Sequence, residues 1–169
     1  CGFKITLEDI DELSSIVPTI TNVYPNGSAD VNQFHSAGGV AAFIGSLLDG
    51  GYLFADVHTL LGKDLTIYRN NIEIKNNELT WETPSKILDQ SIIRDSNNPF
   101  NSTGGLKLID GNIGRGIIKT SSLKSSITHI EGHAIVFNNQ EEVLEAFGLG
   151  KLNKDCIIVV RGQGPSANG

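Results

Sequence analysis

The hydrophobic and polar positions in the first third of the chain recur at helical spacing. Thr6, with Asp9 three residues later, forms a capping signal before apolar residues spaced by three, which predicts a short helix that ends before Pro18. A second helical start lies around residues 28–30. The clearest pattern covers residues 38–49, where apolar side chains recur at intervals of three and four and a glycine pair follows. This part of the chain is therefore predicted to be helical.

From about residue 63 onward, the pattern changes to short alternating segments separated by glycine, asparagine and serine, which is typical of β-strands. One helix, capped by Asn139, interrupts the strands. Because the segments on either side of it are apolar, we expect a parallel β-α-β crossover, with Cys156 as a structural thiol at the start of a fully buried strand. The predicted strands are 65–68, 72–74, 92–94, 106–109, 116–119, 134–137 and 156–160.

These elements predict an α+β, β-rich fold, with a helical segment over residues 1–62 and a β-rich region over residues 63–169. Of the 169 residues, 39% are hydrophobic, which is enough for a packed core and excludes a disordered composition. No apolar run reaches the roughly 18 residues that a membrane helix requires, so a spanning segment is excluded. The formal net charge of −6 argues against a nucleic-acid-binding protein.

Charge and glycine are concentrated in different parts of the chain. Residues 1–84 carry four basic and eleven acidic side chains, whereas residues 85–169 carry nine and eight, so an anionic ligand is expected to meet the second half. The stretch 99–116 is rich in glycine. Either its backbone approaches an anionic ligand, or its glycines form tight turns with the basic side chains outside, and composition leaves both open. The basic residues in or beside this stretch are Lys107, Arg115 and Lys119.

Side chains that hold metals or act as nucleophiles are sparse. Cys1 and Cys156 are too few for a disulfide framework, a zinc site or an iron–sulfur cluster held by this chain alone. None of the four histidines has metal-ligand spacing, and no catalytic triad or pair of catalytic carboxylates can be identified. We therefore predict no metal site in this chain and assign no catalytic residue.

The ends of the chain suggest that it is an internal piece of a larger protein. It contains no methionine, begins at Cys1 and ends in a loop-like string. A piece of this kind leaves apolar surface uncovered, so we expect the stripe formed by Val40, Phe43 and Leu47 to be partly exposed and to promote self-association.

Three strings of residues together resemble a known family. They are Val23–Phe34 with Ala37–Gly39, the stretch Gly104–Lys119 (GGLKLIDGNIGRGIIK), and the closing residues 161–169 (RGQGPSANG). In this order they resemble the 6-phosphogluconate dehydratase branch of the dihydroxy-acid dehydratase family, and the similarity covers essentially the whole chain. The first string favours the sugar-acid branch of that family.

The resemblance implies a cytoplasmic, homodimeric hydro-lyase of the Entner–Doudoroff pathway that converts 6-phospho-D-gluconate to 2-dehydro-3-deoxy-6-phosphogluconate. In such enzymes the exposed iron of an iron–sulfur cluster acts as a Lewis acid on the leaving hydroxyl, and Mg²⁺ is a further candidate cofactor. The resemblance places the cluster ligands and the proton-abstracting base outside this chain. The chain alone is therefore expected to hold no cofactor and to be inactive, and neither nucleic acid nor a membrane is an expected partner.

By the same resemblance, residues 1–62 are the helical end of the N-terminal, cluster-binding domain. Residues 63–169 are a truncated C-terminal domain of the swivelling β/β/α barrel type found in aconitase. Two alternatives stay open: a dihydroxy-acid dehydratase of branched-chain amino-acid synthesis, and a stand-alone anion-binding barrel. The residues that match family segments lining the substrate cleft are Gly104, Gly105, Arg161, Asn168 and Gly169.

Overall fold

A computed structural model describes residues 2–121, 123 and 129–164. Internal contacts divide the chain into two compact units, Cys1–Leu123 and Lys124–Gly169, and each unit has its own helices and strands. The domain boundary predicted after residue 62 concerns the organisation of the whole protein and stays a prediction.

The first two helices begin where the sequence supplies capping side chains. α1 (Leu7–Ile16) follows Thr6, whose hydroxyl accepts a hydrogen bond from the Asp9 N–H while the Asp9 carboxylate accepts one from the Thr6 N–H. Asp30 forms the same reciprocal pair with the glutamine three residues later, at the start of α2 (Val31–Ser36). Both predicted helical starts are confirmed.

The third helix, α3 (Gly39–Asp49), confirms the strongest helical pattern. Its N-cap residue Gly38 adopts a φ of +124°, and a Cβ atom there would lie 2.5 Å from the Lys86 carbonyl oxygen. The glycine therefore permits a close approach between two chain segments, as expected of a packing role. Leu47 is only 6% exposed whereas Val40 is 61% exposed, so the apolar stripe is uncovered at the N-terminal end of the helix and buried further on.

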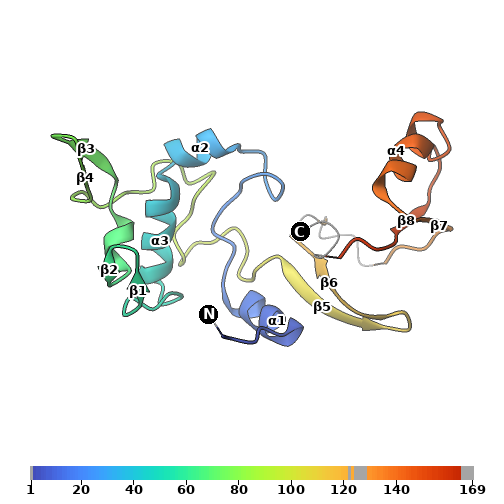
Figure 1. Cartoon of the computed structure of the whole chain (residues 1–169), viewed down its shortest axis with the longest axis horizontal. Helices are drawn as coiled ribbons and strands as arrows, with labels where there is room; N and C mark the ends of the chain where they lie inside the picture. Colours follow the sequence, from blue (N-terminus) through green and yellow to red (C-terminus); the bar gives the residue numbers. More distant parts are fainter. Residues whose placement is uncertain (1, 122, 124–128, 165–169) are drawn as a thin grey trace. The chain divides into compact units, whose positions relative to one another are not determined.

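The strands of the first unit form antiparallel hairpins (Figure 1). They confirm the strands predicted near residues 72–74, 106–109 and 116–119. The β1–β2 hairpin and the second strand of the β3–β4 hairpin are additions that the sequence pattern did not indicate. The pairs are β1 (His58–Thr59) with β2 (Gly62–Lys63), β3 (Glu73–Lys75) with β4 (Glu78–Thr80), and β5 (Leu106–Gly111) with β6 (Gly114–Lys119).

Two of the predicted strands are wrong. The segment 65–68 lies in a 3₁₀ helix, η1 (Thr66–Arg69), because the Asp64 carboxylate accepts a hydrogen bond from the Thr66 N–H at 2.7 Å and turns the chain. The segment 92–94 forms an isolated bridge between Ile93 and Thr21 in place of a strand. Its apolar residues instead build the core, which contains Ala29, Ala37, Ile92 and Ile93, with Val23, Phe34 and Ile87 packed against it.

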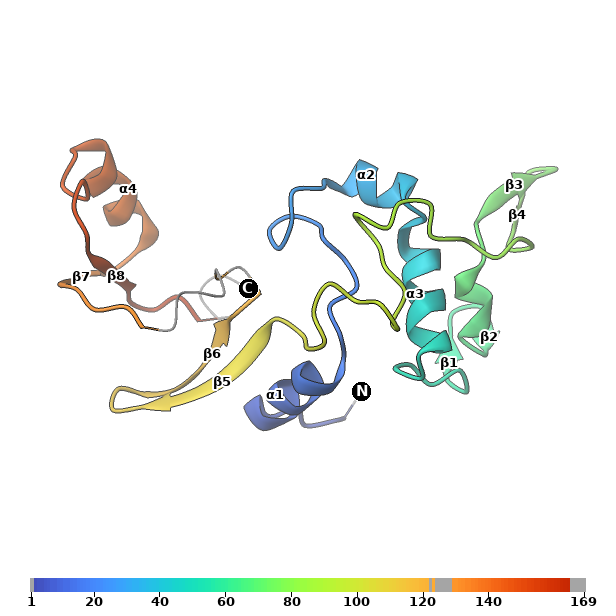
Figure 2. The same ribbon diagram turned by 180° about the vertical axis from the view of Figure 1, so that it is seen from behind.

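The helix α1 packs along the β5–β6 hairpin, as both orientations of the ribbon show (Figures 1 and 2). The register of this hairpin runs from Leu106↔Lys119 to Gly111↔Gly114. The contact joins the first residues of the chain to the glycine-rich stretch about a hundred residues later, and it positions the candidate site.

The second unit contains one strand–helix–strand motif. β7 (Ala134–Phe137) and β8 (Ile157–Val160) pair in parallel, and α4 (Gln140–Gly148) connects them. Asn139 caps α4 by accepting a hydrogen bond from the Glu142 N–H at 2.9 Å. The predicted helix and the predicted parallel crossover are confirmed.

The expected full burial of the last strand is wrong. Cys156 is half-buried, and Ile158 and Val159 in the middle of β8 are 44% and 41% exposed. Parallel sheets are ordinarily covered on both faces, and a two-stranded sheet with a single helix leaves much of its surface open. The sequence pattern indicated a strand buried on both faces, whereas β7 and α4 bury β8 only in part.

The observed class is a mixed α/β fold with short strands, so the predicted α+β class is confirmed in part. Within the described ranges, the strands form four separate two-stranded sheets and no closed barrel, because a barrel strand needs a neighbour on each edge. No helix among the described residues has the length and apolar character required to cross a membrane.

Candidate functional site

The glycine-rich stretch is held against the end of α1 by backbone contacts that a side chain would block. The Gly104 N–H donates to the Ser14 carbonyl oxygen at 2.6 Å. A Cβ atom on Gly104 would lie 2.6 Å from Ser14 Oγ and 3.0 Å from the Ser14 carbonyl oxygen. The Ser14 hydroxyl in turn accepts from the Leu106 N–H at 3.1 Å. Gly104 is therefore required for the close fit between α1 and the start of β5.

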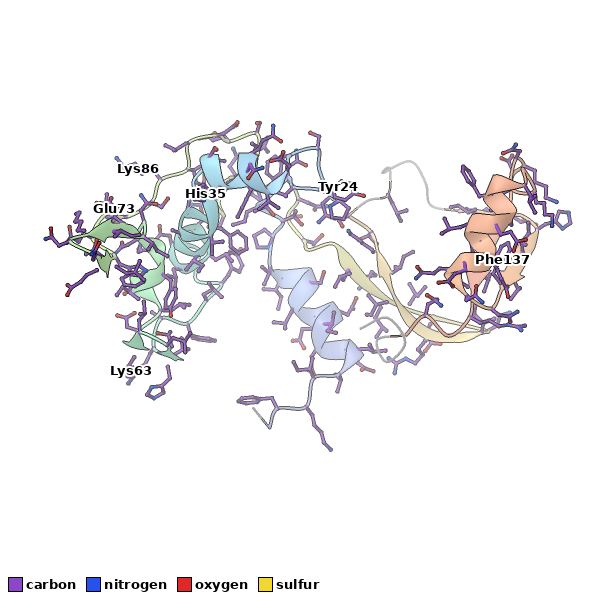
Figure 3. The ribbon with its side chains drawn as sticks, turned by 45° about the horizontal axis from the view of Figure 1, so that its top comes forward. Tyr24, His35, Lys63, Glu73, Lys86 and Phe137 are labelled. Atoms are coloured by element: carbon purple, nitrogen blue, oxygen red, sulfur yellow. The ribbon has the colours of Figure 1, made fainter. Side chains whose placement is uncertain are left out.

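Gly105 lies at a second close contact, beside the end of the same hairpin. Its carbonyl oxygen accepts from the Thr120 N–H at 2.8 Å, and an added Cβ atom would lie 2.4 Å from Ser121 Cβ. The Ser121 hydroxyl donates to Asn26 Oδ1 at 3.0 Å. Asn26 belongs to the Tyr24–Gly27 turn, from which the Tyr24 ring projects (Figure 3). Ser121, just after the second motif string, therefore links Gly105 of that string to Asn26 of the first.

The basic residues of the glycine-rich stretch are engaged by acids of α1. Lys107 Nζ lies 2.9 Å from an Asp11 carboxylate oxygen, whose other oxygen accepts from the Leu108 N–H at 2.7 Å. Arg115 pairs in the same way with Glu8. Of the two explanations left open by composition, an anion site and exterior basic side chains, this pairing supports the second for both residues, because their charges are already balanced.

These contacts also lower the pKa values of the Glu8 and Asp11 carboxyls. The Leu108 N–H, and next the Lys107 ammonium, hold the pKa of the Asp11 carboxyl below its ordinary value. The hydrogen bond from Arg115 is the largest cause of the lowered pKa of Glu8. Both carboxylates therefore remain charged at neutral pH and fix the hairpin to α1.

The other predicted site residues lie elsewhere. Arg161 directly follows β8 in the second unit, where its N–H donates to the Phe137 carbonyl oxygen at 2.9 Å and its guanidinium donates to Asn138 Oδ1 at 3.4 Å. Asn168 and Gly169 lie outside the described residues. Gly104 and Gly105 are thus the predicted cleft-lining residues whose packing partners are known in detail, and their role as cleft lining stays a prediction.

The sequence patterns did not indicate which residues pack around Gly104 and Gly105. Ser14 and Leu106 are 92 positions apart, and Asn26 and Ser121 are 95 apart, so no local pattern connects them. One signal was available: Glu8 and Asp11 are three residues apart on a helix and therefore lie on one face. An acidic helix face and a basic, glycine-rich hairpin in the same chain carry opposite charges, and this indicates that they pair.

The described side chains do not form a metal centre. No group of three or more histidine, cysteine, aspartate or glutamate side chains in the described ranges is arranged to hold a metal ion. Cys156, the cysteine within those ranges, is a single thiol at the start of β8. An iron–sulfur cluster generally takes three or four thiolates, so these residues do not fit such a group.

Comparison with known protein families shows to which family the chain belongs. The model of the N-terminal part of the dihydroxy-acid/6-phosphogluconate dehydratases matches residues 1–71, and the model of their C-terminal part matches residues 91–169. The chain belongs to the dihydroxy-acid/6-phosphogluconate dehydratase family. Residues 72–90, between the two matches, form the part of this family member that contains the β3–β4 hairpin.

Individual members of this dehydratase family are similar along nearly all of the chain. The phosphogluconate dehydratase of Pseudomonas aeruginosa is 42% identical over 169 residues, which is 99% of this chain and 28% of that protein. That of Rhizobium meliloti is 44% identical over 170 residues, with the same coverage. A dihydroxy-acid dehydratase of Caldanaerobacter subterraneus is 32% identical over 166 residues, 97% of this chain and 28% of that protein. The chain thus spans a little over a quarter of the length of the relatives it matches.

Replacing Gly104 by alanine is expected to destabilise the first unit by about 1–3 kcal/mol, because the new methyl group overpacks the contact with Ser14. Urea denaturation of the purified chain measures this change. Gly111→Ala is the matched control: it lies at the other end of β5, has open space at the Cβ position, and is expected to change stability by less than about 0.5 kcal/mol. Equal effects of the two substitutions would contradict the close fit at Gly104.

Acidification is expected to weaken the attachment of α1 to the hairpin. A carboxyl whose folded-state pKa is lowered stabilises the fold above its unfolded-state pKa, and this stabilisation is lost as pH falls through the lower, folded value. The NMR shift of the Leu108 amide should therefore titrate with a midpoint below 3.8, the ordinary pKa of the Asp11 carboxyl, and should lose this titration in Asp11→Asn. A midpoint at or above 3.8 would refute the contact.

Proposed function

We propose that this chain is part of a 6-phosphogluconate dehydratase, a hydro-lyase that converts 6-phospho-D-gluconate to 2-dehydro-3-deoxy-6-phosphogluconate. The observation that carries the proposal is the 42% and 44% identity to two phosphogluconate dehydratases along 99% of the chain. The dihydroxy-acid dehydratase is less similar, at 32% identity. The first motif string, which favours the sugar-acid branch, supports the same choice.

The reaction removes the proton at C2, next to the carboxylate, and the hydroxyl at C3. The C2–H and C3–O bonds break, a C2–C3 double bond forms, and water leaves. The resulting enol takes up a solvent proton at C3 and becomes the 2-keto product. The base and the group that assists the leaving hydroxyl have no assigned residue in this chain, so we propose that other parts of the whole protein supply them.

We propose a supporting role for the residues described here. Gly104 lets the glycine-rich stretch lie against α1, and Gly105 lets it lie against Ser121, which bonds to the Tyr24–Gly27 turn; we propose that these contacts fix the backbone of a cleft wall. The acids of α1 balance Lys107 and Arg115, so this wall is a rigid scaffold and carries little free positive charge. Substrate charge is then balanced by groups outside the contacts described here.

We base the remaining features of the proposal on family membership. An iron–sulfur cluster and Mg²⁺ would be held by residues beyond those described, since the described residues do not fit either group. We further propose that the strands after residue 63 contribute to a swivelling barrel that the whole protein completes, and that this protein is a cytoplasmic homodimer. The open edges and exposed faces of the two-stranded sheets support an assembly larger than this chain.

A dihydroxy-acid dehydratase is the second candidate, because a member of that branch is 32% identical over 97% of the chain. Assay of the full-length protein separates the two. The value of kcat/KM should be higher for 6-phosphogluconate than for a branched 2,3-dihydroxy acid. A higher value for the branched acid would reverse the assignment.

Calorimetric titration of this chain with 6-phosphogluconate tests whether the chain binds substrate as an independent module. We expect no binding, because Lys107 and Arg115 are paired with α1 acids. The Glu8→Gln/Asp11→Asn variant, which leaves both basic residues unpaired, serves as the comparison. Binding by the unaltered chain would favour a stand-alone anion-binding module.

A further inference from the structure

The β3–β4 hairpin has one polar and one apolar face, and the apolar face is uncovered. Ile74 and Leu79 are directly opposite each other and are 74% and 58% exposed. The neighbouring pairs point to the other face, where Lys75 is in contact with Glu73 and Glu82. Figure 3 marks Glu73 on this hairpin. An isolated two-stranded hairpin with an exposed apolar face is marginal in water, and additional strands that extend the sheet stabilise it.

The apolar surface extends beyond the hairpin to α3. Ile72, two residues before Ile74, is 63% exposed and lines a hollow of about 460 Å³. Trp81, the only tryptophan of the sequence, and Val40 of α3 line the same hollow. Apolar side chains that flank the hairpin on either side therefore share this hollow with the exposed end of α3.

The turn of the hairpin determines which backbone groups face outward. Asn76 and Asn77 have φ values of +54° and +63°, the signs expected of a two-residue type I′ turn. In such a hairpin Lys75 and Glu78 exchange backbone hydrogen bonds next to the turn, and bonded and non-bonded pairs alternate along the strands. The N–H and C=O of Ile74 consequently lie on the open edge of β3, available to another strand.

The side chains of β3 are self-complementary about that same residue. If two β3 strands pair antiparallel with Ile74 opposite Ile74 of a second copy, Glu73 lies opposite Lys75 of the second copy, and Lys75 lies opposite its Glu73. Opposite charges across antiparallel strands are stabilising, and a two-fold arrangement makes both pairs at once. The same alignment of β4 about Leu79 places Glu78 opposite Thr80 and gains no ion pair. Charge complementarity therefore favours pairing through β3 over pairing through β4.

We propose that β3 pairs with β3 of a second copy of this protein, forming a four-stranded antiparallel sheet around a two-fold axis at Ile74. The backbone groups of Ile74 then bond across the axis, and the apolar faces of both hairpins join. This hairpin lies in residues 72–90, outside both family matches, so the proposed interface belongs to the connection between the two family domains. The inference does not depend on the proposed reaction.

Disulfide cross-linking of the full-length protein tests the proposal. Opposed residues of a bonded antiparallel pair have Cα atoms about 5.5 Å apart, within the range that a disulfide bridges. Ile74→Cys is therefore expected to form a covalent dimer under mild oxidation, detected on a non-reducing gel. Leu79→Cys is the matched control. It lies on the same face, but three strand spacings of about 4.8 Å separate it from its counterpart, too far for a disulfide.

Charge variants provide the second arm. Adding Lys75→Glu to Ile74→Cys places Glu73 opposite a second glutamate and is expected to reduce the covalent dimer about tenfold. Adding Glu73→Lys as well restores opposite charges and should restore the dimer, although the contact of Lys75 with Glu82 stays lost. The proposal would be overturned by a covalent dimer of Leu79→Cys. It would also be overturned if the dimer yield of Ile74→Cys were the same with and without the Lys75→Glu substitution.

Discussion

Replacing Gly38 by alanine is expected to lower the free energy of unfolding by about 2–5 kcal/mol, one of the two largest effects anticipated in this chain. Two costs combine. A φ of +124° is strained for any residue with a Cβ atom, and the new methyl group would lie 2.5 Å from the Lys86 carbonyl oxygen and 2.7 Å from Ala42 Cβ. Lys86 would have to move away from α3, together with Ser85, whose hydroxyl donates to the Gly38 carbonyl oxygen.

Urea denaturation followed by Trp81 fluorescence measures this effect, because Trp81 and Gly38 line the same hollow. Gly51→Ala separates the two costs: its φ is +74°, but nothing lies within 4 Å of the Cβ position. We expect that control to lose about 1–2 kcal/mol, from backbone strain alone. A loss at Gly38 no larger than the loss at Gly51 would show that the close approach to Lys86 is absent.

The substitution Ile93→Ala is expected to cost about 2–5 kcal/mol, because the side chain is fully buried and its removal leaves a cavity in the core. The core joins the Tyr24–Gly27 turn and α2 to the segment that leads into the glycine-rich stretch. The variant should therefore also loosen the candidate site, seen as faster amide exchange at Gly104, whose N–H donates to Ser14.

The matched control for Ile93 is Leu88→Ala in the same segment. Leu88 is 75% exposed, so its truncation is expected to change stability by less than about 1 kcal/mol. If both substitutions destabilise the chain equally, then Ile93 does not occupy the centre of the core and the packing described here is wrong.

Local signals in the sequence predicted the four α-helices of the described ranges well. Thr6 and Asp30 each cap a helix together with the side chain three residues later, so a few adjacent residues contain all the information needed. The same holds for Asn139, which caps α4. These features are determined by contacts within a few residues, which is the range that periodicity and capping patterns report.

The failures arise where distant or competing contacts decide the structure. Residues 65–68 alternate like a strand, but the Asp64 side chain bonds to the Thr66 N–H and favours a 3₁₀ turn. The apolar segment at Ile93 has the composition of a strand and is in fact the centre of the core. Apolar runs indicate burial, and they do not say whether a sheet or side-chain packing provides it.

The sequence predicted only part of the candidate site. Glycine content marked the stretch 99–116, the family resemblance pointed to Gly104 and Gly105 within it, and both lie at contacts too close for a side chain. Their partners could not be identified from local patterns, because Ser14 lies about ninety positions before Gly104, and Gly105 contacts Ser121 only once the β5–β6 hairpin has folded back. The basic residues were open to two explanations, and the acids of α1 decided between them for Lys107 and Arg115.

The proposed activity is tested most directly by incubating the full-length protein with 6-phosphogluconate in D₂O and analysing the product by NMR and mass spectrometry. Loss of water followed by protonation of the enol predicts 2-dehydro-3-deoxy-6-phosphogluconate carrying one solvent deuterium at C3. Unchanged 6-phosphogluconate, under conditions in which the same preparation dehydrates a branched 2,3-dihydroxy acid, would contradict the account.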